Sequence, residues 1–228
     1  MGLVFVWVFF AIFAHNGFLS MHGVKSYLQV SSEIGILAVG VALLMIAGEF
    51  DLSIGSLIGF SSMSMTLLTV EANMSIPLAS SCALLLTIFV GYCNGLTVVK
   101  SGLPSFIITL GSLFIVRGLT IAVSKIITGR TQLGGISESS GYNFMSSLFS
   151  SNLTISGVDF PISILWWILF VIVGYFLLNH TQIGNWIFAT GASKESSMLM
   201  GIPVAQVKIS LFIVTAFCAW FIAVIQVT

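Results

Sequence analysis

Gly48-Glu-Phe-Asp-Leu-Ser-Ile-Gly-Ser56 places two carboxylates, Glu49 and Asp51, between the apolar runs 34–47 and 54–70. Each charge at the centre of a membrane helix costs roughly 2.5 to 3.5 kcal/mol on insertion scales, so acidic groups near membrane depth usually face a cavity, a polar partner or an interface. The stretch therefore predicts a discontinuous helix pair that serves as a transport pathway or a mechanical joint. A tight turn at the membrane surface is the alternative.

The composition indicates an integral membrane protein. Of 228 residues, 57% are hydrophobic and 6% are charged, and the mean hydropathy is +1.14, whereas soluble domains contain roughly 25% charged residues. Seven Lys and Arg balance seven Asp and Glu, so the expected partner is membrane lipid and not nucleic acid. The three cysteines lie in apolar runs without metal-ligand spacing and are interpreted as small hydrophobic residues; no metal or cofactor is expected.

Seven apolar runs are candidate membrane spans, which need about 20 residues each. They cover residues 3–14, 34–47, 54–70, 76–99, 106–127, 162–178 and 209–227. The expected fold is an all-α, polytopic transmembrane bundle forming one domain over residues 1–228. Because apolar sequence begins directly after Met1 and the last run reaches Thr228 without a polar flank, we expect a fragment that is truncated at the C-terminus and shortened at the N-terminus. The polar connection 128–161 predicts an extramembrane loop with space for a short amphipathic helix.

Residues 181–203 carry the signals of a second feature, a short helix within a loop. Ser193 can cap its N-terminus, Gly201 follows its C-terminus, and Pro203 prevents continuation. The pattern predicts a helix over residues 194–200, with Glu195 placed favourably in its first turn. A helix of one or two turns is marginal alone in water, so it must pack on this protein or on a partner. The apolar side chains available for that contact are Met198, Leu199 and Met200.

Four blocks, in order, make the chain resemble the permease subunits of bacterial ATP-binding-cassette importers for ribose and other simple sugars. Gly48-Glu-Phe-Asp-Leu-Ser-Ile-Gly-Ser56 resembles their Gly-Gly-x-Asp-Leu-Ser-Val-Gly-Ser pattern. The second block is Asn94-Gly-Leu-Thr-Val-Val-Lys100, followed by Leu103-Pro-Ser-Phe-Ile-Ile-Thr-Leu-Gly111 and Arg117-Gly118. The third is Thr181-Gln-Ile-Gly184 with Ala189-Thr-Gly191, and the fourth is Glu195-Ser-Ser-Met-Leu-Met-Gly201. Two positions differ from the family patterns. Glu49 replaces the second Gly of the first pattern, and Ser196-Ser197 replaces an Ala pair in the fourth.

The resemblance implies a monosaccharide permease of the inner (plasma) membrane and names its partners: a second permease subunit, identical or not, a cytoplasmic ATP-binding subunit and a periplasmic sugar-binding protein. The sequence contains no G-x-x-x-x-G-K-[ST] loop for nucleotide phosphates, so no enzymatic activity is expected of this subunit. Family members continue through further spans, which favours a fragment of a larger permease. The implied ATPase-coupling residues are Gly191, Lys194, Glu195, Met198, Leu199 and Gly201. The implied translocation or structural residues are Glu49, Asp51, Ser53, Gly55, Asn94, Gly95, Thr109, Gly111 and Arg117.

The residue types allow roles for the two carboxylates. Asp51 is suited to cap the helix that follows, accepting hydrogen bonds from the amides of Ser53 or Ile54. Glu49 could pair with Arg117, although Arg117 could instead extend to the membrane interface.

Three other functions compete with the sugar-importer interpretation. An ion-coupled secondary transporter would use Glu49 and Asp51 in a broken helix, but it leaves the 194–201 segment unexplained. A permease for branched-chain amino acids shares the architecture. An intramembrane enzyme is disfavoured, because neither H-E-x-x-H nor G-x-S-x-G occurs.

Overall fold

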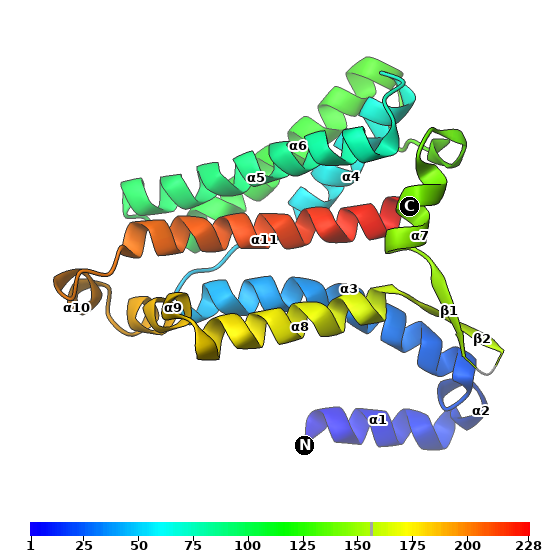
Figure 1. Cartoon of the computed structure of the whole chain (residues 1–228), viewed down its shortest axis with the longest axis horizontal. Coiled ribbons are helices and arrows are strands. Elements are labelled where there is room, and N and C mark those ends of the chain that lie inside the picture. The colour runs from blue at the N-terminus through cyan, green and yellow to red at the C-terminus, as the bar shows by residue number, and fades with distance from the viewer. Residues whose placement is uncertain (156) are drawn as a thin grey trace.

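The structure, a computed structural model, describes residues 1–155 and 157–228 as a bundle of helices with a small hairpin at one end (Figure 1). The longer helices are α1 (Gly2–Phe13), α3 (Met21–Ile46), α4 (Ile54–Val70), α5 (Ile76–Ser101), α6 (Ser105–Thr128), α8 (Ser163–His180), α9 (Gln182–Ala192) and α11 (Val204–Val227). Short elements are α2 (His15–Phe18), the 3-10 helix η1 (Ile136–Glu138), α7 (Tyr142–Phe149), β1 (Asn152–Ile155), β2 (Val158–Pro161) and α10 (Lys194–Leu199).

The predicted all-α bundle is confirmed, but the predicted number of about seven spans is only approximate. In the described residues, five helices are long and apolar enough to cross a membrane, namely α3, α5, α6, α8 and α11. The apolar helices α1 and α4 fall below that length. The seven apolar runs therefore correspond, in the described residues, to five helices of full membrane-spanning length and two shorter helices.

Helix α3 is longer than the apolar run 34–47 indicated, because it begins at Met21 and covers 26 residues. The Ser20 hydroxyl caps its first turn by accepting a hydrogen bond from the Gly23 amide at 3.0 Å. Polar side chains in its first half find partners on other helices: the Ser32 and Ser163 hydroxyls lie 2.8 Å apart, and Gln226 donates to Glu33. These contacts explain why the helix begins among polar residues, well before residue 34, where the apolar run starts.

Helix α11 is the centre of the bundle, and its residues enter all three apolar clusters of the core. Its tightest contact is with α5, at Gly91 and Gly95. A β-carbon on Gly91 would lie 2.6 Å from the Ala216 β-carbon, and one on Gly95 would lie 2.9 Å from the Ile209 α-carbon. Glycines four residues apart allow membrane helices to approach closely, so Gly95 acts in helix packing.

The 128–161 connection contains the expected short helix, α7, and also a hairpin that the sequence did not indicate. Strands β1 and β2 pair antiparallel, with Asn152 opposite Pro161. The Phe149 ring of α7 packs against Trp166 and Phe221, with ring centroids 5.9 and 5.3 Å apart. Aromatic packing thus fixes this loop on one end of the bundle, opposite the end that carries α9 and α10 (Figure 1).

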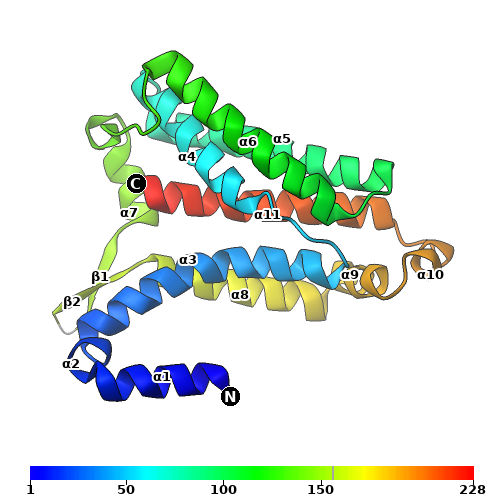
Figure 2. The same cartoon turned by 180° about the vertical axis from the view of Figure 1, so that it is seen from behind.

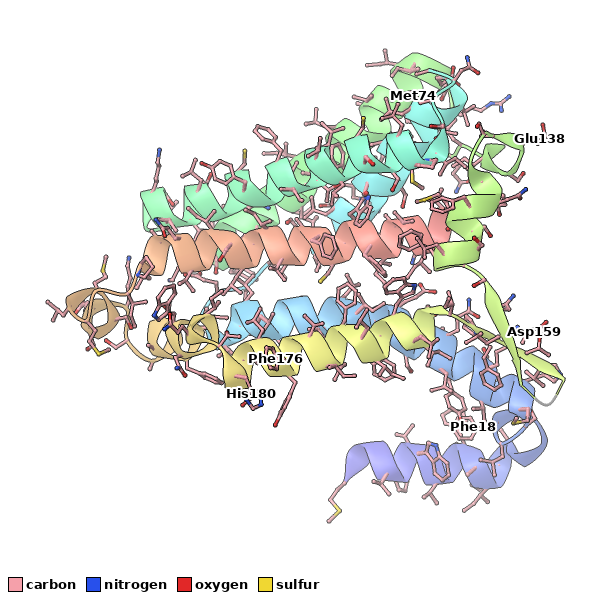
Figure 3. The ribbon with its side chains drawn as sticks, in the orientation of Figure 1. Phe18, Met74, Glu138, Asp159, Phe176 and His180 are labelled. Carbon is pink, nitrogen blue, oxygen red and sulfur yellow. The ribbon has the colours of Figure 1, made fainter. Side chains whose placement is uncertain are left out.

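Helix α1 is held mainly by aromatic contacts at its C-terminal corner. Phe18, labelled in Figure 3, lies within 5.9 Å of the Trp7 ring and 5.4 Å of the Tyr27 ring, measured between centroids. Most of the large apolar side chains of α1 are exposed, and the helix lies apart from the main bundle in both views (Figures 1 and 2). The core that positions the candidate site is therefore built from α3 to α11.

Candidate functional site

The predicted break is an extended stretch, residues 47–53, which we call the broken segment. It leaves the end of α3 beside α9 and crosses the bundle to the start of α4 (Figure 2). Gly48 adopts a φ of 83°, a left-handed conformation that glycine accepts without steric cost. The chain therefore stops the helix sharply and turns into the protein interior.

Helix α6 satisfies part of the exposed backbone of the broken segment. The Phe50 amide donates to the Ser105 hydroxyl at 2.9 Å, and the Leu52 amide donates to the Thr109 hydroxyl at 3.1 Å. Irregular backbone at membrane depth is tolerated only where protein or a water-lined cavity supplies such partners. Thr109 and Ser105 are thus positioning residues that allow an extended chain to run inside the bundle.

Asp51 lies in a buried network of hydroxyl and amide groups. Its Oδ1 accepts from the Ser53 amide at 2.8 Å, which is the bond expected from the sequence, and from the Ser53 hydroxyl at 2.5 Å. Its Oδ2 lies 3.0 Å from the Thr215 hydroxyl, and Asn94 donates to the Ser53 hydroxyl at 2.9 Å. Both carboxylate oxygens are hydrogen-bonded, so this network fastens the start of α4 to α5 and α11.

Glu49 makes the ion pair that the sequence did not predict. Its carboxylate contacts Lys208 Nζ, and the two side chains are only 11% and 14% exposed. The alternative pairing with Arg117 was wrong, since Arg117 lies on α6, exposed and lining a separate groove. Lys208 went unrecognised because the sequence placed it in a loop ahead of the last span.

The contacts with α11 give the depth of the broken segment. Lys208 is the fifth and Thr215 the twelfth of the 24 residues of α11, and seven residues of helix rise about 10 Å. Between Glu49 and Asp51 the segment therefore advances from near one end of α11 to its middle. Helix α4 begins at half the depth of the bundle, as expected for a discontinuous helix and not for a surface turn.

The predicted short helix is present as α10, one residue shorter than expected. The Ser193 hydroxyl accepts from the Ser196 amide at 3.3 Å at its N-terminus. At its C-terminus the Gly201 amide donates to the Met198 carbonyl and the Ile202 amide to the Ser197 carbonyl, each at 3.0 Å, an arrangement that requires the positive φ of 78° at Gly201. Local hydrogen bonds thus fix both ends of α10.

The apolar side chains of α10, and that of Met200 directly after it, are largely exposed. Met198, Leu199 and Met200 are 56%, 90% and 69% exposed, whereas Ser197 is buried at 1%. Lys194 and Glu195 are exposed as well. The helix therefore offers an apolar tip flanked by charges at the end of the bundle (Figure 1).

Both connections of α10 reach the broken segment. On the preceding helix, Gly191 lies so close to α3 that a β-carbon would overlap the Ile46 carbonyl oxygen. On the following helix, Lys208 pairs with Glu49. A cavity of about 320 Å³ lies between the broken segment, α10 and the start of α11. Its lining includes Glu49, Lys194, Met198 and Lys208. Two short routes of contact thus join the ends of α10 to residues 46–49.

The remaining predicted residues lie elsewhere. Gly55 opens a groove between α4 and α6, and Gly111 lies on an exposed part of α6 where an added β-carbon would meet nothing within 4 Å. Sequence reasoning missed Ser105, Lys208 and Thr215. Lys208 carried a usable signal, a lone cation beside a long apolar run, whereas Thr215 was a single hydroxyl within such a run.

The chain is similar in sequence to known transport permeases. Residues 23–228 match the family described as branched-chain amino acid transport system / permease component. The chain is 29% identical over 226 residues to a xylose/arabinose import permease protein of Sulfolobus acidocaldarius, covering 95% of this chain and 58% of that protein. It is 30% identical to an L-arabinose transporter permease protein of Azospirillum brasilense, covering 96% and 62%. It is 28% identical to a ribose import permease protein of Haemophilus influenzae, covering 88% and 59%.

The chain therefore belongs to this family of transport-system permease components, and it is a multi-pass protein of the inner (plasma) membrane. It spans about 60% of the length of the curated relatives that it matches. No solved structure matches it.

Proposed function

We propose that this chain is the membrane-spanning part of an ATP-binding-cassette importer that moves a monosaccharide. In this proposal a separate ATP-binding subunit supplies energy, a periplasmic binding protein delivers the sugar, and a second permease subunit completes the pathway. The relatives named above are permease proteins for xylose/arabinose, L-arabinose and ribose, and this supports a pentose or related simple sugar as the solute.

The observation that carries the proposal is the exposed tip of α10 together with its two routes to the broken segment. A helix of six residues cannot be stable alone in water, and its caps hold it in one orientation with Met198 and Leu199 outward. We assign this tip to a cleft on the cytoplasmic ATPase. Closure of that cleft would move α9 and the start of α11, which hold residues 46–49. ATP hydrolysis would thereby change the conformation of the broken segment.

One other candidate has specific support, and a second is disfavoured by the contacts of the two carboxylates. The family description names branched-chain amino acids, so a leucine permease is the nearest alternative. An ion-coupled transporter would use Glu49 and Asp51 directly, but Glu49 is paired with Lys208 and Asp51 is hydrogen-bonded at both oxygens. Those partners favour a structural role for the two carboxylates.

Uptake into proteoliposomes separates the three candidates. The permease would be reconstituted with its ATPase and supplied with the binding protein, and labelled ribose, xylose, arabinose, fructose and leucine would be tested in parallel. ATP enclosed in the vesicle lumen, which corresponds to the cytoplasm, is expected to drive accumulation of at least one sugar. Accumulation of leucine alone would support the amino acid candidate, and accumulation driven by a sodium or proton gradient without ATP would contradict the proposal.

A further inference from the structure

A groove of about 520 Å³ runs between α4 and α6, on the other side of the broken segment from the cavity beneath α10. Its α4 side consists of Gly55, Ser56, Gly59, Phe60 and Met63, and its α6 side consists of Leu113, Arg117, Thr120 and Ile121. A β-carbon added to Gly55 or Gly59 would meet nothing within 4 Å. The groove thus has the volume typical of a small-molecule site, about 300–1,000 Å³.

Arg117 makes this groove unusual for a surface that faces hydrocarbon. It is the thirteenth of the 24 residues of α6, at the middle of a helix long enough to span a membrane, and it is exposed. The ion pair formed by the described residues, Glu49 with Lys208, does not include it. An ionised side chain at the midplane is costly unless it faces water or a polar partner, so we expect the α4–α6 groove to be hydrated or occupied by a polar group.

The groove also adjoins the broken segment. Ser56, in the first turn of α4, donates to the Ser53 carbonyl at 2.7 Å, and Ser53 hydrogen-bonds to Asp51. On the far side of the segment, Glu49 lines the cavity beneath α10. The broken segment therefore separates two hollows, one at mid-depth and one at the α10 end of the bundle.

We infer that the α4–α6 groove is a wall of the solute pathway, in which Arg117 donates hydrogen bonds to the hydroxyl groups of a neutral sugar in transit and the two glycines set the width. This inference rests on the proposed function. A planar guanidinium has five donors and no acceptor, which suits a solute rich in hydroxyl oxygens. The Ser56 and Thr120 hydroxyls extend the polar lining.

Aqueous access to the groove tests the inference without relying on transport. In a full-length variant with Cys82, Cys93 and Cys218 replaced by Ala, single cysteines are introduced by Gly59→Cys and Thr120→Cys, and Ile115→Cys on the opposite face of α6 is the control. A charged, water-soluble thiol reagent is expected to modify positions 59 and 120 at least about tenfold faster than position 115. Ribose, xylose, arabinose or fructose, whichever the wild type takes up, should slow the modification. Equal rates at the three positions would overturn the inference.

Uptake gives an independent readout with matched variants. Gly59→Leu is expected to reduce sugar uptake at least tenfold, whereas Gly118→Leu, at a glycine of α6 with equally open surroundings, should leave it within about twofold. Arg117→Ala should reduce uptake in the same way relative to Lys125→Ala on the same helix.

Disulfide formation between two copies through Gly59→Cys, with no reagent access, would show that a second subunit fills the groove and would contradict the inference. ATP-driven uptake by the wild type combined with unreactive groove cysteines would refute this inference alone, leaving the proposed function intact.

Discussion

Lys208→Met is expected to lower the free energy of unfolding by about 3 to 5 kcal/mol, because it leaves the Glu49 carboxylate buried without its partner. The combined variant Glu49→Gln with Lys208→Met should recover most of that loss, since replacing a buried ion pair by neutral groups is often nearly neutral. Denaturant unfolding of the purified protein in detergent measures both effects.

Lys100→Met provides the matched control, because Lys100 is exposed at the last turn of α5 and its removal should change stability by less than about 0.5 kcal/mol. If the ion pair also transmits movement from α10, the combined variant should fold well but still take up sugar at a reduced rate. A Lys208→Met variant as stable as Lys100→Met would contradict the assigned pairing.

The second large effect is expected at the contact between α9 and α3. Gly191→Val places a branched side chain where even a β-carbon would overlap the Ile46 carbonyl oxygen. No rotamer change can relieve an overlap with backbone, so α9 must move away from the start of the broken segment, at a cost of about 1 to 3 kcal/mol or more. Sugar uptake is expected to fall at least tenfold.

Ala192→Val is the control for that change, because it introduces the same side chain at the next, exposed position of the same helix. Its uptake should stay within about twofold of wild type. Gel filtration of both variants separates misfolding from loss of coupling. Uptake by Gly191→Val equal to that of Ala192→Val would show that the tight contact has no part in transport.

Local signals in the sequence predicted the elements whose causes are local. The ends of α10 follow from Ser193 and Gly201, because each of these residues forms its hydrogen bond with a partner three residues away along the chain. Asp51 likewise binds the Ser53 amide two residues away. For these residues the pattern carried both the position and the physical reason.

Features created by distant contacts could not be predicted in the same way. The partner of Glu49 lies 159 residues away, and nothing in a single sequence brings Lys208 closer to it than Arg117. Helix α3 was expected to begin at residue 34 because its first half is polar, yet Ser32 and Glu33 find their partners on α8 and α11. Hydropathy measures how readily a segment transfers into lipid. It carries no information on the hydrogen bonds between helices that allow a polar helix face inside the bundle.

Crosslinking from Met198 tests the central claim most directly. Met198→Cys, introduced into the full-length permease without its native cysteines, would be combined with single cysteines placed around the candidate docking cleft of the ATPase, with Thr97→Cys on α5 as a control outside the tip. We expect a crosslink from position 198 whose yield changes on addition of ATP, and no crosslink from position 97. The absence of any crosslink from position 198, in a protein that still takes up sugar, would contradict the assignment of α10 as the contact with the ATPase.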